Sequence, residues 1–305
     1  MLTQKTASQA ILEQLASDQR RVLSDWRALI LLRRATLNLA ARERRWSELP
    51  QGVTDLYPLL RQMQRRGELA PLGDIRRLYE VTVPYARTGP IAEDEVVMEV
   101  DPYAALSHIS AMVFHGVTDD LPRSITVMTP ADGRGDQLPL DTQPRDWEGI
   151  PLVSGRHPAK VLGHPVQWIK VKPENFFGLA VYQPRGYAVR VTNVERTLLD
   201  GLLAPERCGG IANVLRAWAF ARDTLDLDVV VSQVDRFRIA VLRQRVGFVL
   251  DELGLPHPAL ETWRTQTHRG GSSRLVASAP YAPQFSERWN LSLNASVTAL
   301  REAAL

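Results

Sequence analysis

The chain has 305 residues, of which 45% are hydrophobic and 23% charged, a composition typical of a soluble globular protein with room for two domains. No apolar run approaches the roughly 18 residues of a membrane-spanning helix, and the first residues lack a signal-peptide core. The single cysteine, Cys208, cannot form an internal disulfide, and its apolar neighbours favour a buried thiol over a catalytic one. We therefore expect a cytoplasmic protein with no membrane partner.

The net charge of +3 is unevenly distributed along the chain. Residues 1–90 contain 15 Lys and Arg against 9 Asp and Glu, whereas residues 91–305 contain 22 against 25. A local basic excess is typical of a region that binds nucleic acid. Because Val83–Ile91 is extended and contains Pro and Gly, we predict a domain boundary there, with an N-terminal domain at 1–90 and a larger domain at 91–305.

The N-terminal domain is predicted to begin with three helices. Residues 3–24 have a sparse apolar stripe that predicts a helix, which could be a packing arm, a dimer contact or a frayed extension. A denser apolar pattern predicts a second helix from Asp25 to about Arg45. A short helix over Trp46–Leu49 would end at Pro50-Gln51-Gly52.

The next stretch, Thr54–Val83, is the most informative part of the sequence. Its first half, Thr54–Arg66, predicts a helix with one apolar stripe, made of Leu56, Leu59, Leu60 and Met63. Gly67 is expected to end this helix, because glycine readily adopts positive φ. The opposite face carries basic and amide side chains, namely Arg61, Gln62, Arg65 and Arg66.

Two extended runs follow this helix, Glu68–Leu72 and Arg76–Val83, joined by a tight turn at Gly73-Asp74. A helix with a basic face followed by a hairpin with a basic tip predicts a winged helix-turn-helix, whose helix enters the major groove while the wing reaches the neighbouring backbone. The expected DNA contacts of this domain are Thr54, Tyr57, Arg61, Gln62, Arg65, Arg66, Arg76 and Arg77. The alternative is an ordinary amphipathic helix and hairpin whose arginines are only solvated.

The larger domain interleaves helices and strands without a strict βαβ rhythm, so we predict a mixed α/β (α+β) fold and a two-domain chain. Its polar segment Ala131–Ile150 is a candidate mobile loop or hairpin insertion. The predicted helices are Tyr103–His115, Val194–Leu203, Ile211–Ala221, Asp228–Val234 and Phe237–Leu253. The predicted strands are Ser124–Met128, Val166–Val171, Ala180–Gln183, Ala188–Thr192, Ser273–Ala277 and Trp289–Leu293.

The sequence contains no Walker loop, dinucleotide-binding glycine motif, nucleophile elbow or zinc-protease motif. His157 and His164 have no carboxylate or thiolate at a metal-ligand spacing, and His108 and His115 are more readily explained as structural histidines. A nuclease would need a carboxylate before a Glu-x-Lys strand to hold Mg²⁺, but the run V-Q-W-I-K-V-K has Gln167 in that place. We therefore expect no catalysis, no metal and no cofactor.

Six segments of the second half form an ordered series over about 185 residues. They are S-A-M-V-F-H-G-V-T-D-D-L-P (110–122), V-K-P-E-N-F-F-G (171–178), V-T-N-V-E-R-T-L-L-D-G-L (191–202), P-E-R-C-G-G-I (205–211), R-Q-R-V-G-F-V-L-D-E-L-G (243–254) and R-W-N-L-S-L-N (288–294). These segments resemble the signature blocks of AbiEi-type antitoxins, the regulatory partners in abortive-infection type IV toxin–antitoxin pairs. The blocks are mostly apolar or glycine-bearing, so we expect them to reflect the fold and not a site.

The resemblance implies a two-domain autorepressor. Its winged helix would bind inverted repeats in the promoter of its own operon, with Thr54–Arg66 as the reading helix and Leu72–Tyr79 as the wing. Its second domain would counter a nucleotidyltransferase-like toxin and assist DNA binding through a basic face. On this sequence that face would use Arg236, Arg238, Arg243 and Arg245, although the negative balance of residues 91–305 argues against a large contribution.

Two functional hypotheses follow. The first is an antitoxin and DNA-binding transcriptional repressor with no catalytic activity. The second is a DNA-directed enzyme, whose nuclease-like C-terminal domain is brought to DNA by the winged helix. A nucleotidyltransferase gene directly downstream would favour the first, and metal-dependent cleavage of DNA or RNA by the purified protein would favour the second.

Overall fold

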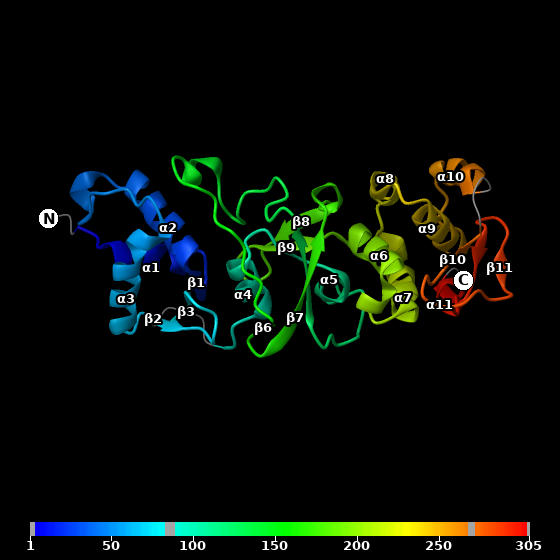
Figure 1. The fold of residues 1–305 in the computed structure, drawn as a ribbon, viewed down its shortest axis with the longest axis horizontal. Helices are drawn as coiled ribbons and strands as arrows, with labels where there is room; N and C mark the ends of the chain where they lie inside the picture. Colours follow the sequence, from blue (N-terminus) through cyan, green and yellow to red (C-terminus); the bar gives the residue numbers. More distant parts are fainter. Residues whose placement is uncertain (1–3, 83–88, 268–271, 304–305) are drawn as a thin grey trace. The chain divides into compact units, whose positions relative to one another are not determined.

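The computed structural model describes residues 4–82, 89–267 and 272–303, which have a mixed α/β fold (Figure 1). The chain forms two compact units. Unit 1 contains Met1–Ala105, Thr129–Glu174 and Val181–Arg190, and unit 2 contains Leu106–Met128, Asn175–Ala180 and Val191–Leu305. The predicted boundary between residues 90 and 91 lies inside unit 1, and residues 83–88 of the predicted linker lie outside the described residues. A division of function at that point stays a prediction.

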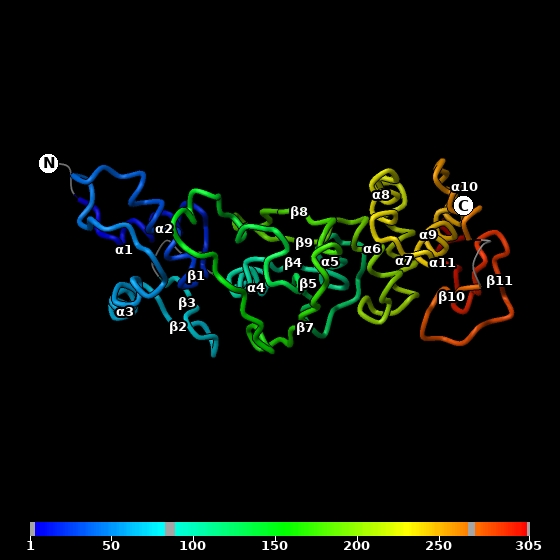
Figure 2. The backbone as a smooth tube through the Cα atoms, turned by 45° about the horizontal axis from the view of Figure 1, so that its top comes forward, coloured from blue at the N-terminus to red at the C-terminus, as the bar shows by residue number. Residues whose placement is uncertain are grey.

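The N-terminal part of unit 1 combines helices with short strands. Thr6 caps the first helix, because its hydroxyl accepts the backbone N–H of Gln9 at 3.2 Å, and Ser24 caps the second by accepting that of Arg27 at 3.1 Å. Three antiparallel strands form a sheet in the order β1-β3-β2, and Figures 1 and 2 show α3 beside β2 and β3. The elements are α1 (Ala7–Ser17), β1 (Val22–Ser24), α2 (Asp25–Asn38), η1 (Ala41–Glu43), η2 (Val53–Leu56), α3 (Tyr57–Arg65), β2 (Leu69–Pro71) and β3 (Leu78–Val81).

One hydrophobic cluster holds these helices together. It includes Ile11 and Leu15 of α1, Leu29 of α2, and Leu60 and Met63 of α3, all of which are buried. Burial of such side chains contributes on the order of 1.5–3 kcal/mol each. The apolar stripe predicted for the α3 region therefore fixes which side of α3 faces outward.

Three helix predictions for this part differ from the structure. Helix α2 begins at Asp25 as expected but ends at Asn38, not near Arg45. Residues 3–24 do not form one helix, because α1 ends at Ser17, Gln19 has φ 53°, and Val22–Ser24 pairs as β1 with β3. The partner strand lies far along the chain, so a local apolar pattern does not indicate this pairing. Trp46–Leu49 has no helical structure either.

The largest sheet has six strands in the order β6-β7-β5-β4-β9-β8. Strands β6 and β7 are antiparallel, with Lys160 opposite Pro165, whereas β4 and β9 are parallel, with Leu106 opposite Val191. The borders between the two units fall within or directly beside four of these strands. The strands are β4 (Ala105–Leu106), β5 (Ile125–Pro130), β6 (Lys160–Val161), β7 (His164–Val171), β8 (Leu179–Tyr182) and β9 (Val189–Thr192).

A buried ion cluster connects α4 (Glu93–Val100) to β1 and α2 within unit 1. One carboxylate oxygen of Glu99 accepts hydrogen bonds from Arg20 Nη1 at 3.1 Å and Arg27 Nε at 2.9 Å. Its other oxygen accepts the Ser24 hydroxyl at 2.6 Å. Burial lowers the pKa of Arg27 to about 10, and the nearby Glu99 carboxylate opposes this shift. Helix α4 was not expected, because its buried residues include Glu95 and Glu99 and form no apolar stripe.

The polar segment Ala131–Ile150, predicted as a candidate mobile loop or hairpin insertion, contains turns and a short 3-10 helix but no strand, and it packs against α2. It contains η3 (Pro144–Trp147), and Trp147 stacks on Trp26 with ring centroids 6.5 Å apart. The Arg33 guanidinium donates to the carbonyl oxygens of Asp146 at 3.0 Å and Glu148 at 2.6 Å. These long-range hydrogen bonds order a segment that has few apolar residues of its own.

Unit 2 is mainly helical, and Figure 2 shows α6, α7, α9 and α11 gathered around its core. The predicted helix Tyr103–His115 is shorter than expected, because Ala105–Leu106 forms β4 and the helix begins at His108. A small sheet has the order β10-β12-β11. The remaining elements are α5 (His108–Phe114), η4 (Pro173–Asn175), α6 (Val194–Leu203), η5 (Pro205–Arg207), α7 (Ile211–Ala221), η6 (Arg222–Thr224), α8 (Leu227–Phe237), α9 (Ala240–Glu252), α10 (Ala259–Thr267), β10 (Ser273–Arg274), β11 (Phe285–Ser286), β12 (Leu291–Ser292) and α11 (Thr298–Ala303). Across the described ranges, no helix has the length and apolar character needed to cross a membrane.

Candidate nucleic-acid interface

Helix α3 presents a basic and polar face to solvent. Its inner side chains, Leu60 and Met63, are buried in the hydrophobic cluster of unit 1. The outer side chains predicted as DNA contacts are all exposed, namely Arg61, Gln62, Arg65 and Arg66. An open hollow of about 580 Å³ on this helix is lined by Pro58, Arg61, Gln64 and Arg65. Two guanidinium groups therefore lie beside a space that an anionic group can enter.

Most of these outer side chains are free of protein partners. Arg61 donates weakly to the carbonyl oxygen of Tyr57, at 3.3 Å. Among the residues that the structure describes, the side chains of Gln62, Arg65 and Arg66 form no hydrogen bond or ion pair. Such donors need not break internal contacts to bind a phosphate or a base edge.

The N-terminal end of α3 supplies the other two predicted contacts. Thr54 is exposed in η2, and its carbonyl oxygen accepts the backbone N–H of Tyr57. Tyr57 is half-buried, because the guanidinium of Arg77 lies 4.3 Å above the centre of its ring. This cation–π contact joins the start of α3 to the turn that precedes β3.

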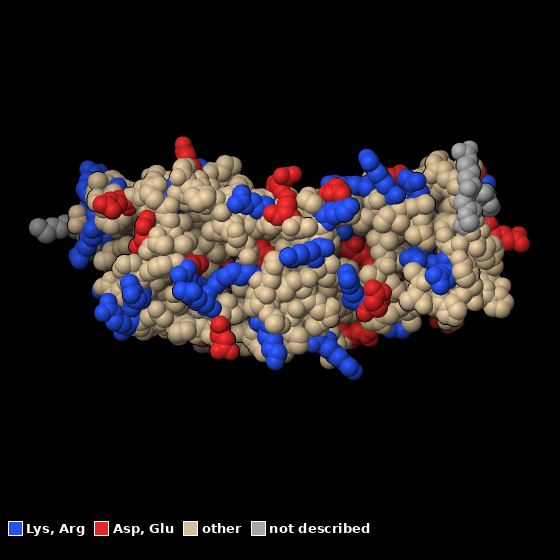
Figure 3. Space-filling view, in the orientation of Figure 1, with Lys and Arg blue, Asp and Glu red and all other residues tan. Residues whose placement is uncertain are grey.

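The two arginines of the β2–β3 turn differ in how far their side chains are held by protein contacts. Gly73 and Arg77 have positive φ, at 57° and 59°, so the chain reverses tightly between β2 and β3. Arg77 is held by Tyr57 and lies 3.7 Å from the Asp25 carboxylate, with 35% of its side chain exposed. Arg76 has an exposed side chain, and its carbonyl oxygen accepts a hydrogen bond from Arg156. Figure 3 shows Lys and Arg side chains over the region where Figure 1 places α3 and this turn.

The four arginines predicted in the second domain do not form one free basic face. Arg236 is exposed with its guanidinium 4.2 Å above the Phe177 ring, and Arg238 is exposed at φ 57° after α8. Arg243 is bonded to Asp235 at 3.0 Å. Arg245 is buried and donates to the carbonyl oxygens of Arg274 at 3.0 Å and Leu202 at 2.7 Å. A buried guanidinium with two carbonyl partners cannot reach a phosphate, so we leave Arg245 out of the interface.

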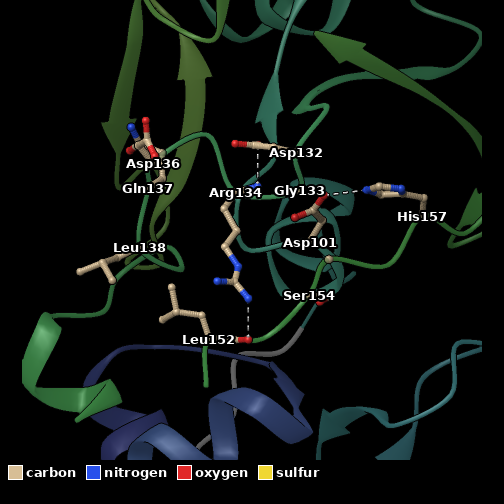
Figure 4. Close-up of a pocket in the computed structure, with 11 residues that line it drawn as sticks. Asp101, Asp132, Gly133, Arg134, Asp136, Gln137, Leu138, Leu152, Ser154 and His157 are labelled. Carbon is tan, nitrogen blue, oxygen red and sulfur yellow. Dashed lines mark hydrogen bonds and ion pairs between the residues drawn. The ribbon is translucent and has the colours of Figure 1, made fainter. Parts of the chain in front are cut away.

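A separate cavity of about 580 Å³ lies in unit 1 (Figure 4). The Asp101 carboxylate is 1% exposed and bonds His157 Nε2 at 2.8 Å and the Thr129 hydroxyl at 3.0 Å. Asp132 accepts the backbone N–H of Arg134 at 3.0 Å, and the Arg134 guanidinium points toward the Leu152 carbonyl oxygen at 3.4 Å. Each of these polar groups already has a partner within the protein, either a side chain or a backbone group, which makes the cavity a weaker candidate site than α3.

The histidines have separate protein partners. His157 contacts Asp101, whereas His164 contacts Glu93. In the portion of the chain that the structure describes, no group of three or more His, Cys, Asp and Glu residues could hold a metal ion. His108 is buried and His115 lies 2.7 Å from the Thr192 carbonyl oxygen, and burial lowers the pKa of both imidazoles.

Four of the six segments that resemble antitoxin signature blocks pack on one another in pairs. Arg196 donates to the carbonyl oxygens of Asn175 at 2.9 Å and Phe177 at 2.8 Å, which joins the 191–202 block to the 171–178 block. Its ion-pair partner is Asp200, one turn further along α6, at 2.9 Å. These contacts give the residues of both blocks a structural role in the fold.

A second pair of blocks meets where α9 contacts the segment before β12. A Cβ atom added to Gly247 would lie 2.2 Å from ring atoms of Trp289, so only glycine fits there without displacement. Trp289 is 1% exposed, and its indole N–H donates to Asp251 at 2.7 Å. The 243–254 and 288–294 blocks are therefore also joined by packing.

Comparison with known proteins adds information about the fold. No protein-family model matches the chain, and no curated protein matches it. The structure is similar to the crystal structure of the RV2827C protein from Mycobacterium tuberculosis, with a TM-score of 0.51 and 14% sequence identity. The similarity covers 99% of this chain and 96% of that chain. At this identity the likeness concerns the fold alone, and it spans both units.

Proposed function

We propose that this chain is an antitoxin-like transcriptional repressor, which binds DNA in the promoter of its own operon and counters a nucleotidyltransferase-like toxin. The observation that carries the DNA-binding part is the exposed face of α3, with Arg61, Gln62, Arg65 and Arg66 on a helix whose other side is fixed in a core. Arg can bind guanine O6 and N7, and Gln can bind adenine N6 and N7. The face therefore combines base-reading groups with positive charge.

The arrangement of the surrounding elements supports this proposal. The order α1, β1, α2, α3, β2, β3, with the strand order β1-β3-β2, agrees with a winged helix-turn-helix. In it, α2 and α3 would be the paired helices, α3 would enter the major groove, and β2 with β3 would form the wing. Arg76 would contact a phosphate directly, and Arg77 would do so with its exposed part while it braces Tyr57.

The antitoxin part of the proposal rests on the resemblance of the six sequence blocks to AbiEi-type antitoxins. Four of these blocks pack together in unit 2, so they define a scaffold and do not single out a toxin-contacting side chain. The alternative, a DNA-directed enzyme, is not favoured by any arrangement of side chains described above. We therefore assign repression to the α3 region and toxin neutralisation to the remainder of the chain.

A reporter assay tests the repressor part of the proposal. The full-length chain should repress a reporter driven by its own promoter, and the double variant Arg61→Ala, Arg65→Ala should lose repression. Each lost base contact should cost about 1–3 kcal/mol, or roughly 5- to 150-fold in Kd. Arg264→Ala is a matched control, because Arg264 pairs with Glu261 within its own helix in unit 2.

If a nucleotidyltransferase-like gene lies beside the coding sequence, the same strains test neutralisation when they also carry that gene. Growth should be restored by the wild type, by the control and by the double variant. Equal repression by the double variant and the wild type would contradict the role of α3. Failure of the wild type to restore growth would contradict the antitoxin role and leave the repressor role standing.

A further inference from the structure

Most lysines of this chain lie in one short segment. Only four of its 37 basic residues are lysines, and three of them, Lys160, Lys170 and Lys172, fall within the segment 160–172 that contains β6 and β7. We call this segment the lysine hairpin. All three lysines are exposed, whereas several arginines of unit 1 are buried in internal contacts.

The charges of the lysine hairpin are available to an external partner. Among the described residues, neither Lys160 nor Lys170 forms an ion pair. Lys172 lies 3.9 Å from Glu174, but their side chains are 77% and 67% exposed, so this pair is worth little. Because alternate residues of an extended strand share a face, Trp168, Lys170 and Lys172 are expected on the same side of the hairpin.

A chain of contacts within unit 1 connects that face to the β2–β3 turn. His157 packs against Trp168 with ring centroids 4.7 Å apart. Its neighbour Arg156 donates to the carbonyl oxygen of Arg76, which lies in the turn between β2 and β3. Arg77 in turn lies over Tyr57 of α3. A continuous series of contacting residues therefore links the lysine hairpin to α3.

We propose that the lysine hairpin binds the phosphate backbone of the same duplex that α3 reads, beyond the contact made by the β2–β3 turn. This inference rests on the proposed DNA-binding function and extends it to a second contact surface in unit 1. A lysine ammonium is a compact, mobile point charge, which suits a phosphate and carries no base recognition. The hairpin should therefore add affinity and salt dependence without adding sequence preference.

Salt titration of DNA binding by the full-length protein tests this inference. The double variant Lys170→Gln, Lys172→Gln should lower the slope of log K against log salt by roughly 1.8, since each lost phosphate contact removes about 0.9. Affinity for promoter DNA and for a shuffled duplex should fall in the same proportion. Lys5→Gln is the matched control, because Lys5 is a lysine of unit 1 that pairs with Glu13 at 2.6 Å, and its slope should equal that of the wild type.

The outcomes separate this inference from the proposed function. An unchanged slope in the lysine variant, with binding lost in the Arg61→Ala, Arg65→Ala variant, would overturn the hairpin contact and keep the repressor. A reduced slope in the lysine variant, with an unaffected α3 variant, would keep the hairpin and overturn the role of α3. An unchanged slope together with lost growth rescue would show that the hairpin binds a protein, which also overturns the inference. Circular dichroism of each variant confirms that it is folded.

Discussion

Replacement of Glu99 by glutamine is expected to destabilise unit 1 strongly. The Glu99 side chain is fully buried, and those of Arg20 and Arg27 are 2% and 1% exposed. The substitution keeps the shape of the side chain but removes the negative charge that both guanidinium groups contact. Loss of one partner from a buried ion pair typically costs 3–5 kcal/mol, because it leaves an uncompensated buried charge.

The lower end of that range applies to this cluster. Asp141 bonds Arg20 Nη2 at 2.8 Å and lies 3.8 Å from Arg27 Nη1, so part of the positive charge keeps a partner. The Asp141 side chain is 40% exposed, and solvent weakens its effect. We therefore expect Glu99→Gln to lower the free energy of unfolding by about 3 kcal/mol, which corresponds to a fall in Tm of roughly 6–12 °C.

Denaturant unfolding followed by circular dichroism measures this change. Glu13→Gln is the control, since its pair with Lys5 has side chains 57% and 42% exposed and should contribute less than about 1 kcal/mol. A Glu99→Gln protein within about 1 kcal/mol of the wild type would refute the view that this carboxylate balances the two arginines. A fragment that begins at residue 91 should likewise be unstable, because it retains Glu99 and loses Arg20, Ser24 and Arg27.

Three further predictions concern unit 2. Gly247→Ala should lower the free energy of unfolding by about 1–3 kcal/mol, since the new methyl group would overlap the Trp289 ring; a stability unchanged in thermal melts would contradict this packing. Burial raises the pKa of the Cys208 thiol, so iodoacetamide should modify it only after unfolding, and rapid labelling of the native protein would show that the thiol is accessible. Burial lowers the pKa of His108, so as the pH falls through about 6.5 the imidazole binds a proton in the unfolded chain before it does so in the folded protein. The free energy of unfolding should therefore decrease toward acid pH, by at most about 1.4 kcal/mol per pH unit. Unfolding measured at pH 7.5 and 5.5 should show a smaller decrease for His108→Gln than for the wild type.

The α3 region was predictable from sequence because its determinants are local. Leu60 and Met63 define the buried side within two turns, and Gly67, with φ 69°, follows the helix as expected. The structure places α3 at Tyr57–Arg65, and a 3-10 segment, Val53–Leu56, occupies the first part of the predicted helix. The bounds of α7, Ile211–Ala221, agree with the prediction for the same reason.

The burial and the contacts of individual arginines were not predictable from sequence. Arg65 and Arg245 both lie on helices, but Arg65 is exposed and Arg245 is buried. The difference arises because the carbonyl oxygens of Leu202 and Arg274, from distant segments, surround the Arg245 guanidinium. The Arg20 and Arg27 side chains similarly meet Glu99 only after folding. Net charge along the sequence therefore overestimates the basic surface that is exposed to solvent.

The most direct test of the proposed function is a DNase I footprint of the full-length protein on the DNA upstream of its own coding sequence. We expect two protected half-sites that form an inverted repeat, with centres separated by a whole number of helical turns of about 10–10.5 base pairs. The Arg61→Ala, Arg65→Ala variant should lose this protection while it remains folded. Protection equal to that on a shuffled duplex, or an unchanged footprint in the double variant, would contradict the assignment of α3 as the DNA-reading helix.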